Sequence, residues 1–196
     1  MAEPSPADTK DRLRQEAFAR RDALDKDWRR QASKTIAART LELPELQAGG
    51  PVGGYWPIRS EVDPRPILRG LVRRGQDAAL SQIIHPKLSW RLWKPGDVLI
   101  KGGFKVREPG PDAPECFPTV LLVPLACFDR RGGRVGYGKG HFDRSIAALS
   151  ELHPVLAIGL AYSTQEIDAA PVEAHDRMLN IVVTEAEVIR PPATKP

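Results

Sequence analysis

Residues 119–144 read TVLLVPLACFDRRGGRVGYGKGHFDR, a continuous apolar run followed by a glycine-rich loop. The run from Thr119 to Leu125 has the composition of a strand that is buried on both faces. Such strands are typical of parallel sheets that carry helices on both sides. A helix is expected after the loop, from about His141 to Leu149, so this stretch predicts a strand, a loop and a helix in succession.

The remaining segments repeat this alternation of helices and apolar strands. Further helices are expected over residues 8–24 (with Asp8 or Thr9 as the N-cap), between 28 and 43, and over 64–74, and strands over 52–56, 78–84, 88–93, 98–104, 155–160 and 180–184. The alternation predicts a Rossmann-like α/β fold with three α/β/α layers and a mainly parallel sheet. We expect one domain over residues 8–190, a disordered tail at 1–7 and a second tail at 191–196.

The composition excludes several classes of protein. The chain has 196 residues, of which 41% are hydrophobic and 28% charged, and no apolar stretch approaches the roughly 18 residues of a membrane span. The polar start lacks the apolar core of a signal peptide. Cys116 and Cys127 lack the spacing of a zinc site or a disulfide framework. These features predict a cytoplasmic, globular protein without a membrane partner.

The glycine loop predicts an anion site. Ligands of open α/β sheets bind beyond the carboxyl ends of the strands, which is where this loop lies. The alternation of Gly136, Gly138 and Gly140 lets backbone N–H groups converge on a phosphate, and the next helix adds its partial positive charge. Residues 133–139 nearly follow the phosphate pattern G-x-x-x-x-G-K, but Gly140 stands where that pattern has a Mg²⁺-binding Ser or Thr. Asp143 is the nearest carboxylate that could replace that ligand. A solvent-exposed turn, whose glycines only permit tight bends, is the alternative.

The same loop, RVGYGKGHFD at 134–143, resembles the ATP-binding signature R-x-G-x-G-x-G-[YHF]-[YF]-D of the 5-formyltetrahydrofolate cyclo-ligase family, also called methenyltetrahydrofolate synthetases. Other stretches are similar to further blocks of that family, in the same order: Lys10-x-x-Leu13-Arg14, YWPIRSEVD at 55–63, FKVREP at 104–109 and PVEAHD at 171–176. Together they cover nearly the whole chain. The pair His141-Phe142 replaces the commoner Tyr-Tyr, which leaves substrate preference more open than the reaction class.

The resemblance implies ATP-dependent closure of 5-formyltetrahydrofolate, with or without a polyglutamate tail, to 5,10-methenyltetrahydrofolate. It also implies that Asp143 and Asp176 hold Mg²⁺, an ion that prefers carboxylate oxygen. Glu61 would accept the N–H groups of the pterin. The implied ATP-binding residues are Lys10, Arg14, Arg134, Val135, Gly136, Tyr137, Gly138, Lys139, Gly140, His141 and Phe142, with Lys10, Arg14, Arg134 and Lys139 as the catalytic cations. The implied aromatic wall of the folate site is Tyr55, Trp56 and Phe104, although core packing would explain Trp56 nearly as well.

Other functions stay open at this level. Sugar-phosphate isomerases and CoA transferases have related α/β folds, but they would leave the Lys10/Arg14 pair unexplained. The pI of about 9.2 and the segment WRLWK at 90–94 allow an RNA-binding α/β module, although no RNA-binding signature is present and no nucleic acid is expected as a partner. A non-catalytic relative that binds folate or nucleotide is a further alternative. A monomer is expected.

Overall fold

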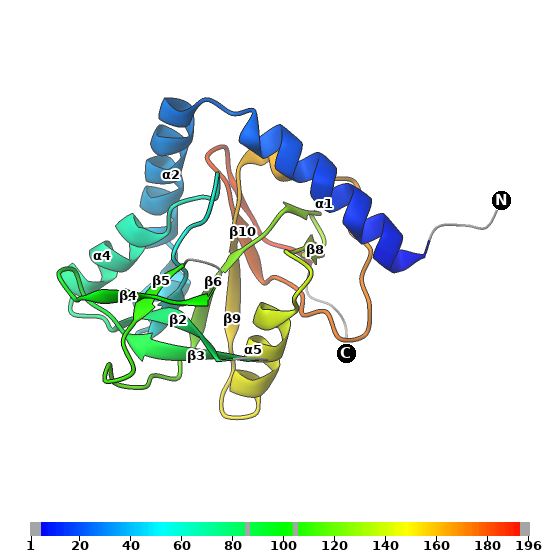
Figure 1. Cartoon of the computed structure of the whole chain (residues 1–196). Coiled ribbons are helices and arrows are strands. Elements are labelled where there is room, and N and C mark those ends of the chain that lie inside the picture. The colour runs from blue at the N-terminus through cyan, green and yellow to red at the C-terminus, as the bar shows by residue number, and fades with distance from the viewer. Residues whose placement is uncertain (1–4, 85–86, 104–105, 193–196) are drawn as a thin grey trace.

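The computed structural model describes residues 5–84, 87–103 and 106–192, which form a seven-stranded sheet flanked by helices (Figure 1). The strand order is β11-β10-β9-β6-β1-β2-β3. The five inner strands are parallel, whereas β3 and β11 run antiparallel at the two edges. The predicted mainly parallel α/β fold is therefore confirmed. The strands are β1 (Val52–Gly54), β2 (Ala78–Ile84), β3 (Lys87–Leu92), β6 (Val120–Pro124), β9 (Leu156–Leu160), β10 (Ile181–Val183) and β11 (Val188–Ile189).

Helices cover both faces of the sheet, and one more lies at its end. The α-helices of the described residues are α1 (Pro6–Asp22), α2 (Lys26–Leu41), α3 (Pro44–Gln47), α4 (Arg65–Arg73) and α5 (His141–Ser150). Alternate residues of the central strand β6 point to opposite faces. Val120 and Leu122 belong to the core cluster that contains residues of α2, α3 and α4, whereas Leu121 and Val123 pack in the cluster of α5. The sheet is thus the middle of three layers, with α2–α4 on one face and α5 on the other.

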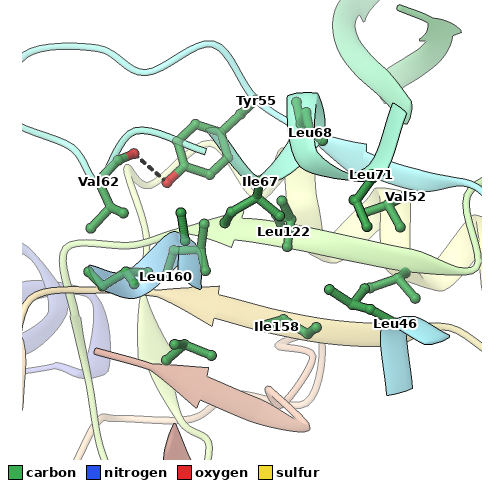
Figure 2. Packing of buried hydrophobic residues seen from close by; sticks show 14 of the residues in the cluster. Leu46, Val52, Tyr55, Val62, Ile67, Leu68, Leu71, Leu122, Ile158 and Leu160 are labelled. Atoms are coloured by element: carbon green, nitrogen blue, oxygen red, sulfur yellow. Dashed lines mark hydrogen bonds between the residues drawn. The ribbon is translucent and has the colours of Figure 1, made fainter. Parts of the chain in front are cut away.

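The larger core lies between the sheet and α4 (Figure 2). Ile67, Leu68 and Leu71 recur at the spacing of one helix face, and each is at most 1% exposed. Tyr55 is part of this core, because only 4% of it is exposed and its hydroxyl donates to the carbonyl oxygen of Val62 at 2.9 Å. That hydrogen bond satisfies a hydroxyl that has lost contact with water.

The two tryptophans of the segment at 90–94 are core residues. Trp90 and Trp93 are 3% and 6% exposed, and the indole N–H of Trp90 donates to Ser145 Oγ at 2.9 Å. Gly53 makes room for Trp90, since a Cβ there would lie 2.7 Å from a ring carbon. The hypothesis that these rings stack on RNA is therefore wrong.

Several predicted boundaries differ from the structure. The first helix begins at Pro6, and its N-cap is Ser5, which forms a capping box with Asp8; the expected cap at Asp8 or Thr9 is wrong because Ser5 already satisfies the Asp8 N–H. Strand β1 ends at Gly54, two residues earlier than expected. The strand predicted at 98–104 is β4 (Leu99–Lys101), which pairs with β5 (Arg107–Pro109) in a separate hairpin.

A small hairpin within the glycine segment and helix α1 lie together beyond the carboxyl end of β6. Strands β7 (Cys127–Phe128) and β8 (Arg134–Val135) form this hairpin, which the sequence did not predict. Ala17 of α1 packs against Cys127 and Val135 in a third apolar cluster. In Figure 1 the helix runs along this end of the sheet. No helix in the described part of the chain is long and apolar enough to cross a membrane.

Candidate functional site

A cavity of about 470 Å³ lies beyond the carboxyl ends of β1, β2 and β6. It brings together α1, the loop that follows β1, the glycine loop and the segment 173–176, which are far apart in the chain. Phe104 lies outside the described residues. Every other predicted site residue lines this cavity: Lys10, Arg14, Tyr55, Trp56, Glu61, Arg134, Val135, Gly136, Tyr137, Gly138, Lys139, Gly140, His141, Phe142, Asp143 and Asp176.

The glycine loop owes its shape to two left-handed residues and to one arginine of α1. Gly138 and Gly140 have φ of +82° and +60°, values that residues with a Cβ rarely adopt. Arg14 Nε donates to the carbonyl oxygen of Gly136 at 2.7 Å, and a Cβ on Gly138 would lie 3.1 Å from Arg14 Nη2. Gly140 is also the N-cap of α5. The loop therefore packs closely against Arg14, and the N-terminus of α5 lies at the cavity.

Arg134 and Asp143 form a partly buried ion pair at the base of this loop. Arg134 Nη2 donates to Asp143 Oδ1 at 2.6 Å, and the side chains are 5% and 19% exposed. The backbone N–H of Arg177 donates to the same oxygen at 3.0 Å, and Arg134 Nη1 donates to the Arg177 carbonyl oxygen. Arg134, which was predicted to bind phosphate, and Asp143, which was predicted to bind Mg²⁺, thus bind each other and the backbone of Arg177.

Lys10 makes a similar link between α1 and the C-terminal segment. Its Nζ lies 2.5 Å from Asp176 Oδ2 and 2.7 Å from Glu173 Oε2, and the Glu173 N–H donates to the same Asp176 oxygen at 2.8 Å. Burial lowers the pKa of Lys10, but its hydrogen bonds to Asp176 and Glu173 outweigh this, so the pKa is raised and the amine stays charged. A bound phosphate would compete with these two carboxylates for Lys10.

Asp143 and Asp176, the two residues predicted to hold Mg²⁺, both line the cavity. Each engages a cation through one oxygen, and the other oxygen of Asp176 lies 3.6 Å from His175 Nε2. Within residues 5–84, 87–103 and 106–192 no group of three His, Cys, Asp or Glu side chains is arranged to hold a metal ion. Mg²⁺ commonly takes one or two carboxylates and completes its shell with water and phosphate oxygens. A magnesium ion at these two aspartates would therefore need phosphate oxygens and water to complete its shell.

Glu61 is a further carboxyl group that lines the cavity. Its Oε2 accepts the Ile58 N–H at 2.7 Å across a tight turn. Burial raises the pKa of Glu61 to about 7, whereas the Ile58 N–H, the charge of Arg21 and a hydrogen bond with Tyr137 act to lower it. Near neutral pH this carboxyl group is poised between its two protonation states. Carboxyl groups with such shifts are common at functional sites.

Trp56 lies at the wall of the cavity beside a fixed cation. The Arg65 guanidinium lies 4.7 Å from the centre of the Trp56 ring, a distance that favours a cation–π interaction. Asp63 holds Arg65 through two hydrogen bonds of 2.7 Å. Trp56 also packs against the edge of the core, so it both lines the cavity and contributes to core packing. Tyr55 contributes less surface to the cavity than Trp56, because nearly all of its side chain is buried in the core.

The cavity also has an apolar wall that the sequence analysis missed. Its members are Ile58, Ile83, Leu88, Val106 and Pro124. Ile83 and Pro124 lie near the carboxyl ends of β2 and β6, where the rule for open α/β sheets places ligands, so that rule could have found them. Leu88 and Val106 reach the cavity only through the placement of β3 and the β4–β5 hairpin. Glu173, whose role as a partner of Lys10 was also missed, lies in the block at 171–176.

Comparison with known proteins agrees with this geometry. The family model described as the 5-formyltetrahydrofolate cyclo-ligase family matches residues 6–185. The chain belongs to this family. It is 28% identical to 5-formyltetrahydrofolate cyclo-ligase of Escherichia coli K12 over 177 residues, which cover 86% of this chain and 96% of the relative. It is 27% identical to the Saccharomyces cerevisiae cyclo-ligase over 199 residues, which cover 89% and 94% of the two chains.

Solved structures of cyclo-ligase relatives share the fold. The NMR structure of Aquifex aeolicus 5,10-methenyltetrahydrofolate synthetase superposes with a TM-score of 0.80 at 29% identity, covering 95% of each chain. The Mycoplasma pneumoniae synthetase, at 20% identity and a TM-score of 0.71, supports the fold. Membership makes the chain an enzyme of a ligase family that forms carbon–nitrogen bonds. It also removes the isomerase and transferase alternatives.

Proposed function

We propose that this cyclo-ligase family member converts 5-formyltetrahydrofolate and ATP to 5,10-methenyltetrahydrofolate, ADP and phosphate, with Mg²⁺ as the cofactor. The observation that carries the proposal is the polarity of one cavity. One cavity is lined both by the cations and the glycine loop and by Glu61, Trp56 and apolar residues, and we assign the first group to the nucleotide end and the second to the folate end. A nucleotide phosphate and a flat, partly apolar heterocycle would therefore meet within a single cavity.

The chemistry needs a better leaving group than a formyl oxygen. That oxygen attacks the γ-phosphorus, the bond to the β-phosphate oxygen breaks, and ADP leaves. The N10 nitrogen of the folate then attacks the activated formyl carbon and loses its proton, and cleavage of the carbon–oxygen bond releases phosphate. Alignment and charge neutralisation provide most of the catalysis in such phosphoryl transfers.

The nucleotide end of the cavity supplies alignment and charge. The N–H groups of the loop between Arg134 and Phe142 would hold the phosphates, together with the first turn of α5. Lys10, Arg14 and Lys139 would neutralise the charge that moves between the oxygens. Asp143 and Asp176 would hold Mg²⁺, which supplies further neutralisation of the phosphates when bound.

The folate end supplies recognition. As a carboxylate, Glu61 would accept two N–H groups of the 2-amino-pyrimidinone edge, a charge-assisted arrangement with a defined direction. The indole of Trp56, held by Arg65, would form one wall beside the pterin. A monomer, a cytoplasmic location and acceptance of polyglutamylated folate remain predictions.

The test is the near-ultraviolet absorbance of the methenyl product in a mixture of purified protein, 5-formyltetrahydrofolate, ATP and Mg²⁺. We expect the band to grow only when ATP is present. Lys10→Met is expected to slow it about 100-fold, as the loss of a transition-state cation would. Lys26→Met is the matched control, because Lys26 is exposed at the start of α2. A folded protein that binds ATP and folate without forming the band would instead be a non-catalytic relative.

A further inference from the structure

Arg21 is a buried arginine that donates hydrogen bonds to three segments bordering the cavity. It lies on α1, on the face that also carries Lys10 and Arg14, but only 1% of it is exposed and it does not line the cavity. Nε donates to Ser60 Oγ at 2.9 Å, and Nη1 donates to the Leu125 carbonyl oxygen at 3.2 Å. Ser60 precedes Glu61, and Leu125 follows β6. The third donor, Nη2, reaches the glycine loop.

Tyr137 is the residue of the glycine loop that receives this third hydrogen bond. Arg21 Nη2 lies 2.8 Å from the Tyr137 hydroxyl oxygen, and the guanidinium also lies 5.9 Å from the centre of its ring. Because Arg21 only donates, the hydroxyl proton is left for an acceptor on the other side. That acceptor is the carboxylate of Glu61, with which Tyr137 shares a side-chain hydrogen bond. Burial raises the pKa of Tyr137, so the group remains a phenol that can donate.

We infer that Arg21 is a positioning residue that acts through the Tyr137 hydroxyl to keep Glu61 ionised and oriented for the folate. The inference deepens the proposed function and rests on it. It places Tyr137, expected only as a member of the ATP loop, between the two substrate sites. A nucleotide that orders the loop also orders the donor to Glu61, so each ligand strengthens the binding of the other to the same degree.

The other groups around Glu61 are compatible with this arrangement. The Ile58 N–H donates to it within its own turn, and the ring of Tyr55 packs at the end of β1. From beyond β9, the Tyr162 hydroxyl donates to the backbone carbonyl oxygen of Glu61 at 3.3 Å. These groups are neutral. Arg21 supplies the positive charge that favours the ionised carboxyl group against its burial.

The first experiment measures the affinity for 5-formyltetrahydrofolate without ATP, from about pH 6 to pH 9. In the wild-type protein the affinity is expected to rise as Glu61 ionises, with a midpoint near its pKa of about 7. In Tyr137→Phe the midpoint moves to higher pH, and the affinity near neutral pH falls about tenfold, as expected for one lost hydrogen bond to a charged group. The difference in affinity between Tyr137→Phe and the wild type disappears towards pH 9.

Two arginine variants complete the series. Arg21→Lys keeps a charge but loses the fork of donors, so it should shift the midpoint in the same direction. Arg20→Lys is the matched control, because Arg20 is its exposed neighbour and donates to the Thr164 carbonyl oxygen, outside the cavity. Its profile is expected to overlay that of the wild type. If Arg21→Lys fails to fold, Tyr137→Phe still tests the inference.

A second titration, with a non-hydrolysable ATP analogue, measures the coupling. The analogue should tighten folate binding in the wild type and have little effect in Tyr137→Phe. A Tyr137→Phe profile that overlays the wild type, or an affinity that falls by the same factor at every pH, overturns the inference and leaves the proposed function standing. A wild-type protein that does not bind 5-formyltetrahydrofolate at all overturns the proposed function itself.

Discussion

Replacing Glu61 by glutamine is expected to stabilise the fold at alkaline pH while weakening folate binding. Glutamine keeps the length of the side chain and an oxygen for the Ile58 N–H, but it has no proton to lose. In the wild type the pKa of Glu61 rises from an ordinary 4.5 to about 7 on folding, because burial disfavours the charged form. A group with a raised folded-state pKa contributes stability at low pH and loses it as pH rises through the folded value.

The magnitude follows from the two pKa values. Each pKa unit corresponds to about 1.4 kcal/mol, so ionisation of Glu61 removes about 2.5 kcal/mol of folding free energy between pH 5 and pH 8.5. The glutamine variant keeps this folding free energy, because its side chain does not ionise. Its unfolding free energy relative to the wild type is therefore expected to rise by about 2.5 kcal/mol over that interval. Its affinity for 5-formyltetrahydrofolate at pH 8.5 is expected to fall about 100-fold, because two charge-assisted hydrogen bonds are lost.

Urea unfolding at the two pH values measures the stability difference directly. Glu42→Gln is the matched control, because Glu42 is exposed at the end of α2, and its difference from the wild type should not change with pH. A Glu61→Gln variant whose relative stability is constant, or falls, as pH rises would refute the reasoning. It would mean that Arg21 and the Ile58 N–H stabilise the charge more than burial disfavours it. A stabilised but impaired variant would show that the carboxyl group is retained for binding.

Two further substitutions test the nucleotide end. Asp143→Asn leaves the guanidinium of Arg134 buried without its carboxylate, so the free energy of unfolding measured in urea should fall by about 3 kcal/mol. In this variant Mg²⁺ should no longer strengthen nucleotide binding. An unchanged free energy of unfolding would contradict the structural role of Asp143. Gly138→Ala should cost about 1–2 kcal/mol and weaken ATP binding at least tenfold, because φ is +82° and the new Cβ would meet Arg14. The matched Gly136→Ala should leave the unfolding free energy unchanged, since its Cβ would meet nothing within 4 Å, and equal losses in both variants would contradict the account.

The sequence predicted the elements whose signals are local. The apolar run of β6, the glycine loop and the start of α5 at His141 follow from neighbouring residues alone, and the structure confirms them. The N-cap at Ser5 was missed because three candidate caps stand within five residues, and only the structure distinguishes them. The two tryptophans suggested a surface site, because their burial depends on Gly53, which is 37 residues from Trp90.

Long-range pairing at the site had no local signal. Lys10 and Asp176 are 166 residues apart, and only the fold shows that they form an ion pair. The family resemblance implied separate partners for these two residues, phosphate for Lys10 and Mg²⁺ for Asp176. Likewise Arg21 looks like one more basic residue on a surface helix, and its burial becomes evident only when β6 and the glycine loop close over it. The resemblance to the family therefore predicted which groups gather at the cavity, whereas their mutual contacts required the tertiary structure.

The most direct test of the proposed reaction follows one oxygen atom. The protein is incubated with ATP, Mg²⁺ and 5-formyltetrahydrofolate labelled with oxygen-18 in the formyl group, and the released phosphate is analysed by mass spectrometry. Transfer of the γ-phosphoryl group to the formyl oxygen predicts one labelled oxygen in each phosphate released with the methenyl product. Methenyl product accompanied by unlabelled phosphate would contradict the account, because the formyl oxygen would then have left by another route.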